Sequence, residues 1–215
     1  GLFNNRIFLS ADYYVKTTKD LLYQVTVPAL LGFTKAWGNI GSIRNKGFEL
    51  EVTTQNLTGR LKWSTSLNVS YNQNKVLSLG DDNSTVFTGY DSTTQVFMVD
   101  QPLRSFYMYD AVGVYQTQAD LQKYPVMQNS KVGDVRYRDA NGDGVINDSD
   151  RTLMGKPDPD YTFGITNTFK YKNFDLSFLI TAQTGGQIYS VLGRAMDRPG
   201  MGANGNVLSH WKNMW

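Results

Sequence analysis

The residues that decide the fold are Leu61-Lys-Trp-Ser-Thr-Ser-Leu-Asn-Val-Ser-Tyr-Asn72. Every even position in this stretch is polar, whereas the odd positions are apolar or aromatic except for Thr65. A period of two places the two sets on opposite faces of a β-strand. Residues 7–16, 47–54, 161–171 and 174–183 repeat the pattern. The sequence therefore predicts an all-β, antiparallel architecture.

Two antiparallel structures share this alternation. One is a soluble sheet with one face on a core and the other in water. The other is a transmembrane β-barrel, in which the apolar face meets lipid and the polar face meets the lumen. Strands of about 9–12 residues favour the barrel, because this length spans a bilayer when tilted and soluble strands are usually shorter. Aromatic residues near the strand ends, such as Trp63 and Tyr71, also suit the membrane interfaces.

The lengths of the connections give a topology. The links 55–60 and 172–173 are short, whereas 17–46, 73–160 and the segment from 184 onward are long. Outer-membrane barrels have short periplasmic turns and long extracellular loops. We therefore predict that residues 1–215 belong to one β-barrel domain and that 73–160 is a large extracellular loop region. Runs at 105–115 and 132–138 predict a hairpin in that region, with a further pair of spans as the alternative.

The number of predicted membrane-spanning strands is too small for a closed barrel. Five spans do not close a barrel, since the smallest known have about eight strands. An open sheet would leave unpaired edges in hydrocarbon. The sequence therefore predicts a piece of a longer barrel.

Composition excludes several functions. The 215 residues have a net charge of +2, no cysteine and one histidine, His210. Disulfides, thiolate nucleophiles and zinc–thiolate sites are excluded, and a near-zero net charge argues against nucleic acid as a partner. No apolar run is long enough for a transmembrane helix. Because no set of residues resembles a catalytic constellation, we expect no enzymatic activity.

Residues 139–150 match the twelve-residue calcium loop of EF-hands. Oxygen ligands are expected at positions 1, 3, 5, 7, 9 and 12, with Val145 using its carbonyl and Gly144 providing the sharp turn. An aspartate at position 12 predicts weak affinity, and a structural ion in an extracellular loop is the predicted role. The alternative is a plain cluster of Asn-Gly and Asp-Gly turns. The predicted calcium ligands are Asp139, Asn141, Asp143, Val145, Asn147 and Asp150.

The same region carries a resemblance to a known family. Residues 133–151, 155–164 and 174–178, together with 105–109 and 113–117, resemble the SusC/RagA family of TonB-linked outer-membrane transporters of Bacteroidota, and residues 39–51 resemble the strand entry of TonB-dependent barrels generally. The resemblance implies a 22-stranded barrel in the outer membrane, a plug domain and a TonB box, of which this sequence carries only part of the barrel. It also implies TonB and a SusD-like surface lipoprotein as partners, with oligosaccharides or peptides as imported ligands.

Aromatic residues in the predicted loops are candidates for ligand contact, because sugars stack on such rings. The alternative is that these rings pack the loops together or meet the lipoprotein. For the whole protein, a passive porin and a soluble, calcium-stiffened β-domain that binds glycans are the other functions considered. The candidate substrate-binding residues are Trp37, Phe87, Tyr90, Phe97 and Tyr107, with Phe106 beside them.

Overall fold

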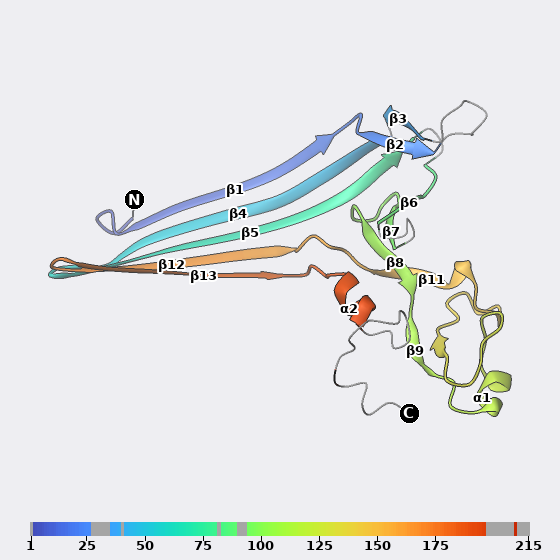
Figure 1. The fold of residues 1–215 in the computed structure, drawn as a ribbon. Helices are drawn as coiled ribbons and strands as arrows, with labels where there is room; N and C mark the ends of the chain where they lie inside the picture. Colours follow the sequence, from blue (N-terminus) through green and yellow to red (C-terminus); the bar gives the residue numbers. More distant parts are fainter. Residues whose placement is uncertain are drawn as a thin grey trace.

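The main element is one long antiparallel sheet of five strands. The computed structural model describes residues 2–26, 35–39, 41–80, 83–89, 94–196 and 209. Each strand of the sheet hydrogen-bonds to the next in the order β1-β4-β5-β12-β13 (Figure 1), which is the meander expected of a section of barrel wall. The strands are β1 (Ile7–Thr18), β4 (Gly41–Thr58), β5 (Leu61–Leu79), β12 (Tyr161–Tyr171) and β13 (Phe174–Thr184).

All five predicted strands are confirmed, and two of them, β4 and β5, are longer than predicted by seven or more residues. β4 begins at Gly41 and β5 continues to Leu79, where the two strands still pair with each other. In this extension Lys46 lies opposite Gln73, so the apolar alternation has ended while the backbone ladder continues. The first part of the predicted 73–160 loop region is therefore strand.

The apolar face is bounded by aromatic side chains. Tyr13, Phe48, Tyr71 and Tyr161 occupy one register row near the long loops, which we call the loop-side aromatic row. Ring centroids within it lie 5.7 Å apart for Phe48–Tyr71 and 4.8 Å apart for Tyr71–Tyr161. From Leu61 to Tyr71 the strand rises about 33 Å, or about 25 Å after a tilt of about 40°, which is the height of a barrel's lipid-facing band.

Nearer the short turns, the apolar face carries a second aromatic group. The rings of Trp63 and Phe169 stack with centroids 5.5 Å apart. The Trp63 indole Nε1–H donates to Asn167 Oδ1 at 2.9 Å, and the Thr65 hydroxyl donates to the same oxygen at 2.7 Å. An indole with a satisfied N–H near the end of an apolar band is typical of a membrane interface.

The opposite face is polar. The Tyr14 hydroxyl donates to Asn72 Oδ1 across two strands at 3.2 Å, and the hydroxyls of Thr53 and Ser66 lie 3.3 Å apart. The Tyr14 ring covers Gly47, where a Cβ would lie 2.7 Å from the Tyr14 hydroxyl oxygen and 2.1 Å from a backbone oxygen of β5. Gly47 therefore lets the strands and the ring approach closely.

Short strands and helices gather at the loop end of the sheet (Figure 1). None of the described helices is long and apolar enough to cross a membrane. In the described part of 80–160 the strands have at most five residues, too few for a further pair of spans. The elements are β2 (Leu22–Thr26), β3 (Lys35–Asn39), β6 (Val86–Thr88), β7 (Gln95–Phe97), β8 (Ser105–Tyr109), β9 (Ala111–Val114), β10 (Val135–Tyr137), β11 (Arg151–Gly155), α1 (Gln118–Lys123) and α2 (Val191–Met196).

These short strands form three small sheets. The first is a four-stranded sheet in the order β11-β8-β7-β6, and the second is the β2–β3 hairpin. In the third, β9 pairs with β10, which confirms the predicted pairing between the later part of 105–115 and 132–138. β8, by contrast, belongs to the four-stranded sheet, where it lies between β7 and β11.

Candidate functional site at the loop end of the sheet

A small hydrophobic core fixes the four-stranded sheet to the end of β5. Val76, Leu79 and Phe97 form its buried centre, with exposed fractions of 0%, 5% and 7%. The backbone N–H of Val76 donates to the Gln101 carbonyl at 2.9 Å, so the chain after β7 also pairs with the free edge of β5. The loops here are therefore built onto the wall of the sheet.

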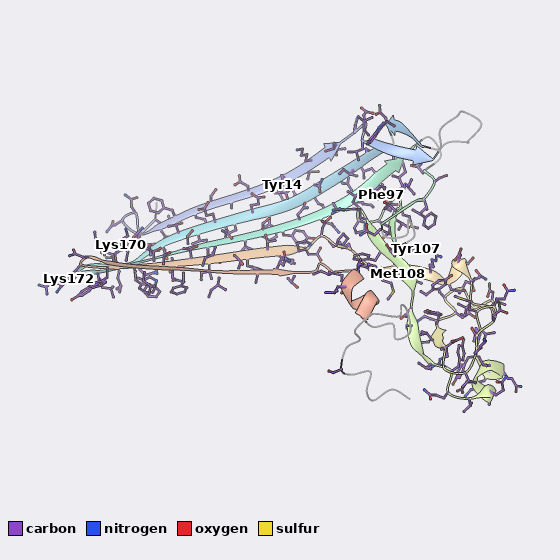
Figure 2. All side chains as sticks on the ribbon, in the orientation of Figure 1. Tyr14, Phe97, Tyr107, Met108, Lys170 and Lys172 are labelled. Atoms are coloured by element: carbon purple, nitrogen blue, oxygen red, sulfur yellow. The ribbon has the colours of Figure 1, made fainter. Side chains whose placement is uncertain are left out.

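The candidate ligand-binding aromatics divide into two groups. The ring of Phe97 lies inside this core, so for this residue the packing alternative is the one observed. Phe87 on β6 is 49% exposed, and its ring centroid lies 6.1 Å from that of half-buried Tyr107 on β8. Figure 2 shows Tyr107 and Phe97 at the loop end of the sheet, far from Lys170 and Lys172 at the turn end.

The remaining candidates lie elsewhere. Trp37 is on the separate β2–β3 hairpin and is 69% exposed. Phe106 is 4% exposed and so is unavailable for contact with a ligand at the surface. Tyr90 lies outside the described residues. The pair of exposed Phe87 and half-buried Tyr107 is therefore the best-formed aromatic surface among the candidates.

Asn74 is a structural residue that the sequence pattern did not single out. It is 7% exposed, and its Oδ1 accepts the backbone N–H of Leu103 at 2.6 Å. Its Nδ2 donates to Asp158 Oδ2 at 3.2 Å. One side chain on β5 therefore holds two loop segments that are far apart in the sequence. Asn74 lies in a run of polar residues, so nothing in the neighbouring sequence distinguishes it as the residue that holds the loops.

Residues 139–150 form a chain of side-chain-capped turns. Asp139 accepts the backbone N–H groups of Gly142 at 2.7 Å and Gly144 at 2.9 Å. Asn141 and Asp143 each accept the N–H two residues further on, both at 2.9 Å. Gly144 has φ +85°, the left-handed conformation that a glycine adopts without strain. The sharp turn predicted at position 6 is present.

The end of the loop is buried. Asp150 is 0% exposed and accepts the backbone N–H groups of Asn147 at 2.8 Å and Ala140 at 2.9 Å. The Asn147 N–H is the main cause that lowers the pKa of the Asp150 carboxyl, while desolvation opposes it. Ile146 is 2% exposed, and its N–H donates to the Val126 carbonyl at 3.2 Å. The loop is thus anchored by one carboxylate and one apolar side chain.

The donor set suits a hard cation, and the loop also closes on its own hydrogen bonds. Within the described ranges, no lysine or arginine forms an ion pair with Asp139, Asp143 or Asp150, so their charges are not balanced by a basic side chain. Among the same residues, no three acidic or histidine side chains are gathered into a metal-binding group. The residue types fit calcium, and calcium binding stays a prediction.

Comparison with known proteins agrees with this architecture. Residues 2–189 match the family model described as TonB dependent receptor-like, beta-barrel. A TonB-dependent receptor of Formosa agariphila is 34% identical over 195 residues, which cover 89% of this chain and 20% of the relative. The TonB-dependent receptor SusC of Bacteroides thetaiotaomicron is 30% identical over 200 residues, covering 88% of this chain and 19% of the relative.

Solved structures show the same fold. The RagAB peptide transporter matches with a TM-score of 0.65 and 22% identity, covering 86% of this chain and 19% of the matched chain. The open-open state of the RagAB peptide importer gives 0.63 and 24%, with the same coverage. The chain spans about a fifth of the length of these relatives. Their family comprises outer-membrane transport proteins rather than enzymes, so the outer-membrane localisation is confirmed. With its continuous strand meander and its match over residues 2–189, this chain belongs to the TonB dependent receptor-like β-barrel family.

Proposed function

We propose that this chain forms a section of the barrel wall and outer mouth of a TonB-dependent transporter that imports oligosaccharides or peptides. The observation that carries the proposal is the five-stranded sheet with an apolar band between aromatic groups and with long loops at one end only. In this assignment the loop end is extracellular and the short turns are periplasmic. A SusD-like surface lipoprotein and TonB are the proposed partners.

The pair of exposed Phe87 and half-buried Tyr107 is the proposed ligand contact at the mouth. Aromatic rings offer flat apolar surface for sugar rings and for apolar peptide side chains. Their separation of 6.1 Å allows one ligand to touch both rings. Trp37 is a second exposed ring, on the separate β2–β3 hairpin, and suits either the ligand or the lipoprotein.

Uptake measurements test this function. Cells that express the complete protein should take up the ligand only when TonB is present, and the purified protein should migrate differently on gels before and after heating. Phe87→Ala should lower uptake while leaving the amount of folded barrel unchanged. Phe3→Ala is a matched control, because Phe3 is also exposed but precedes β1. TonB-independent uptake would favour a passive porin, and recovery in the soluble fraction would favour a soluble glycan-binding domain.

We also propose that Asp139, Asn141, Asp143, Val145, Asn147 and Asp150 hold a calcium ion. When bound, calcium would supply the positive charge that the surrounding side chains lack and would stiffen the extracellular segment. Supporting this, the side-chain oxygens at positions 1, 3 and 5 are ordered by backbone N–H groups, and Gly144 provides the required turn.

Calorimetric titration with Ca²⁺ tests the site. The complete protein should release heat with an affinity in the weak, extracellular range. Asp139→Asn should abolish this heat. Asp148→Asn is the matched control, because Asp148 pairs with Arg151 at 2.8 Å and does not occupy a ligand position. Unchanged heat in Asp139→Asn, or no heat in the wild type, would refute the proposal.

A further inference from the structure

A groove on the outward face of the sheet lies next to the loop-side aromatic row. β4 and β5 continue past Phe48 and Tyr71 in unbroken register, with Lys46 opposite Gln73 and then Arg44 opposite Lys75. These four side chains share the face of Phe48 and Tyr71, because each lies an even number of residues away. They line a groove of about 240 Å³ together with Asp100.

The groove is positively charged and is not neutralised within the chain. Arg44 and Lys75 are direct cross-strand partners, and like charges in that position destabilise a sheet. Asp100 compensates part of this charge through an ion pair with Lys75, with Nζ and Oδ1 2.8 Å apart. In the described part of the chain, no carboxylate lies within ion-pair distance of Arg44 or Lys46. An anion bound among these basic side chains would therefore stabilise them.

The height of the groove identifies the environment that supplies the anion. Lys46 and Arg44 lie two and four residues beyond Phe48, which corresponds to about 5 and 10 Å above the aromatic row for strands tilted by about 40°. Polar headgroups occupy a layer of about 5–8 Å on each side of the hydrocarbon core. The groove therefore begins in the headgroup layer, on the side of the wall that faces lipid.

We propose that Arg44, Lys46 and Lys75 form a binding site for the phosphate group of a lipid in the outer leaflet. This inference rests on the proposed function, which assigns the loop end to the outside of the cell. Guanidinium and ammonium groups both bind phosphate, and the planar guanidinium does so with two parallel hydrogen bonds. Gln73 adds an uncharged donor, and the loop-side aromatic row supports the lipid chains below.

The test measures lipid binding to the complete protein in detergent by native mass spectrometry. The probes are lipid A that carries phosphate and the same lipid after enzymatic dephosphorylation. The wild type should prefer the phosphorylated lipid, and added salt should weaken the preference because the groove is partly exposed. Replacing all three basic residues by glutamine should lower the affinity about 100-fold, from about 5-fold for each of the three charges removed at an anionic surface.

Two variants serve as controls. Lys16→Gln removes a lysine at the same height, opposite Asn45, but on the polar face with Tyr14, so it should not change lipid binding. Asp100→Asn removes the one carboxylate of the groove and should tighten binding about 5-fold. Asparagine tolerates the left-handed backbone of Asp100, which has φ +70°, so this gain does not depend on a destabilised protein.

The outcomes separate this inference from the proposed function. Equal affinity for the two lipids, no tightening in Asp100→Asn, or an equal loss in Lys16→Gln would overturn the lipid site while leaving transport intact. Inorganic phosphate at millimolar concentration should not displace the lipid, and full displacement would show a site for the free ion instead. Recovery of the wild type in the soluble fraction would refute the proposed function itself.

Discussion

Truncating Phe97 should loosen the mouth of the barrel without touching any ligand. Phe97→Ala removes a ring that is 7% exposed and packed with Val76 and Leu79. A buried Phe→Ala change costs about 3–5 kcal/mol, from lost burial and the cavity that remains. The cost should appear as local opening of the four-stranded sheet from β5, because the long ladder of β4 and β5 does not depend on this ring.

Hydrogen exchange on the complete protein measures this opening. The backbone N–H of Asp100 donates to the Val76 carbonyl at 2.9 Å, and this bond breaks when the sheet leaves β5. Its protection should fall about 100-fold or more, since a factor of ten corresponds to about 1.4 kcal/mol. Amides in the middle of β4 and β5 should keep their protection.

Phe87→Ala is the matched comparison. Phe87 belongs to the same small sheet but is 49% exposed, and its ring contact with Tyr107 is worth about 1 kcal/mol. In Phe87→Ala, the hydrogen-exchange protection of the Asp100 amide should change by less than about 10-fold, while ligand uptake should fall. If Phe97→Ala left the Asp100 amide protected, or if both variants changed protection equally, the assignment of Phe97 to packing would be refuted.

Three further predictions concern the wall and the calcium-like loop. Gly47→Ala should reduce the amount of folded barrel seen as the heat-modifiable band on gels, because the added Cβ would lie 2.1 Å from a backbone oxygen of β5. Gly59→Ala should not reduce it, because no atom lies within 4 Å of the Cβ position there. Leu67→Arg, in the middle of the apolar band, should cost about 2–4 kcal/mol in a lipid-refolding titration, and Ser66→Arg on the polar face should cost much less. Protection of the 139–150 amides from hydrogen exchange should fall in acid. The pKa of the Asp150 carboxyl is lowered in the folded protein. Its contribution to stability is therefore fully present above the ordinary carboxyl pKa of about 4 and is lost as the pH falls through the folded pKa.

The wall of the sheet was predictable because its signal is local. Contact with lipid on one face and with a polar lumen on the other imposes a period of two on every span, and the ends of β12 were predicted as the structure has them. The extension of β4 and β5 was not predicted, because Lys46 and Gln73 interrupt the apolar alternation, and the apolar Val76 and Leu79 beyond them are buried by Phe97, which is distant in the sequence. Backbone pairing continues those strands together with this small core.

The mouth was less predictable, because its strands are too short to show a period. β6 and β7 each have three residues and a similar composition, yet Phe87 is exposed and Phe97 is buried. Only packing against β5 separates the two rings. The turns of residues 139–150 were predictable from the spacing of Asp, Asn and Gly, because each turn is fixed by a hydrogen bond between residues two to five positions apart.

The double hydrogen bond of Asn74 has a consequence for how such proteins diversify. Because Leu103 and Asp158 meet at the same side chain, the chain between them leaves and returns at one point of the wall. The cost of closing a loop grows only slowly with its length, so residues can be added to or removed from this interval with little effect on the strands beneath. Evolution can therefore exchange the surface presented to partners and ligands while the five-stranded sheet keeps its shape.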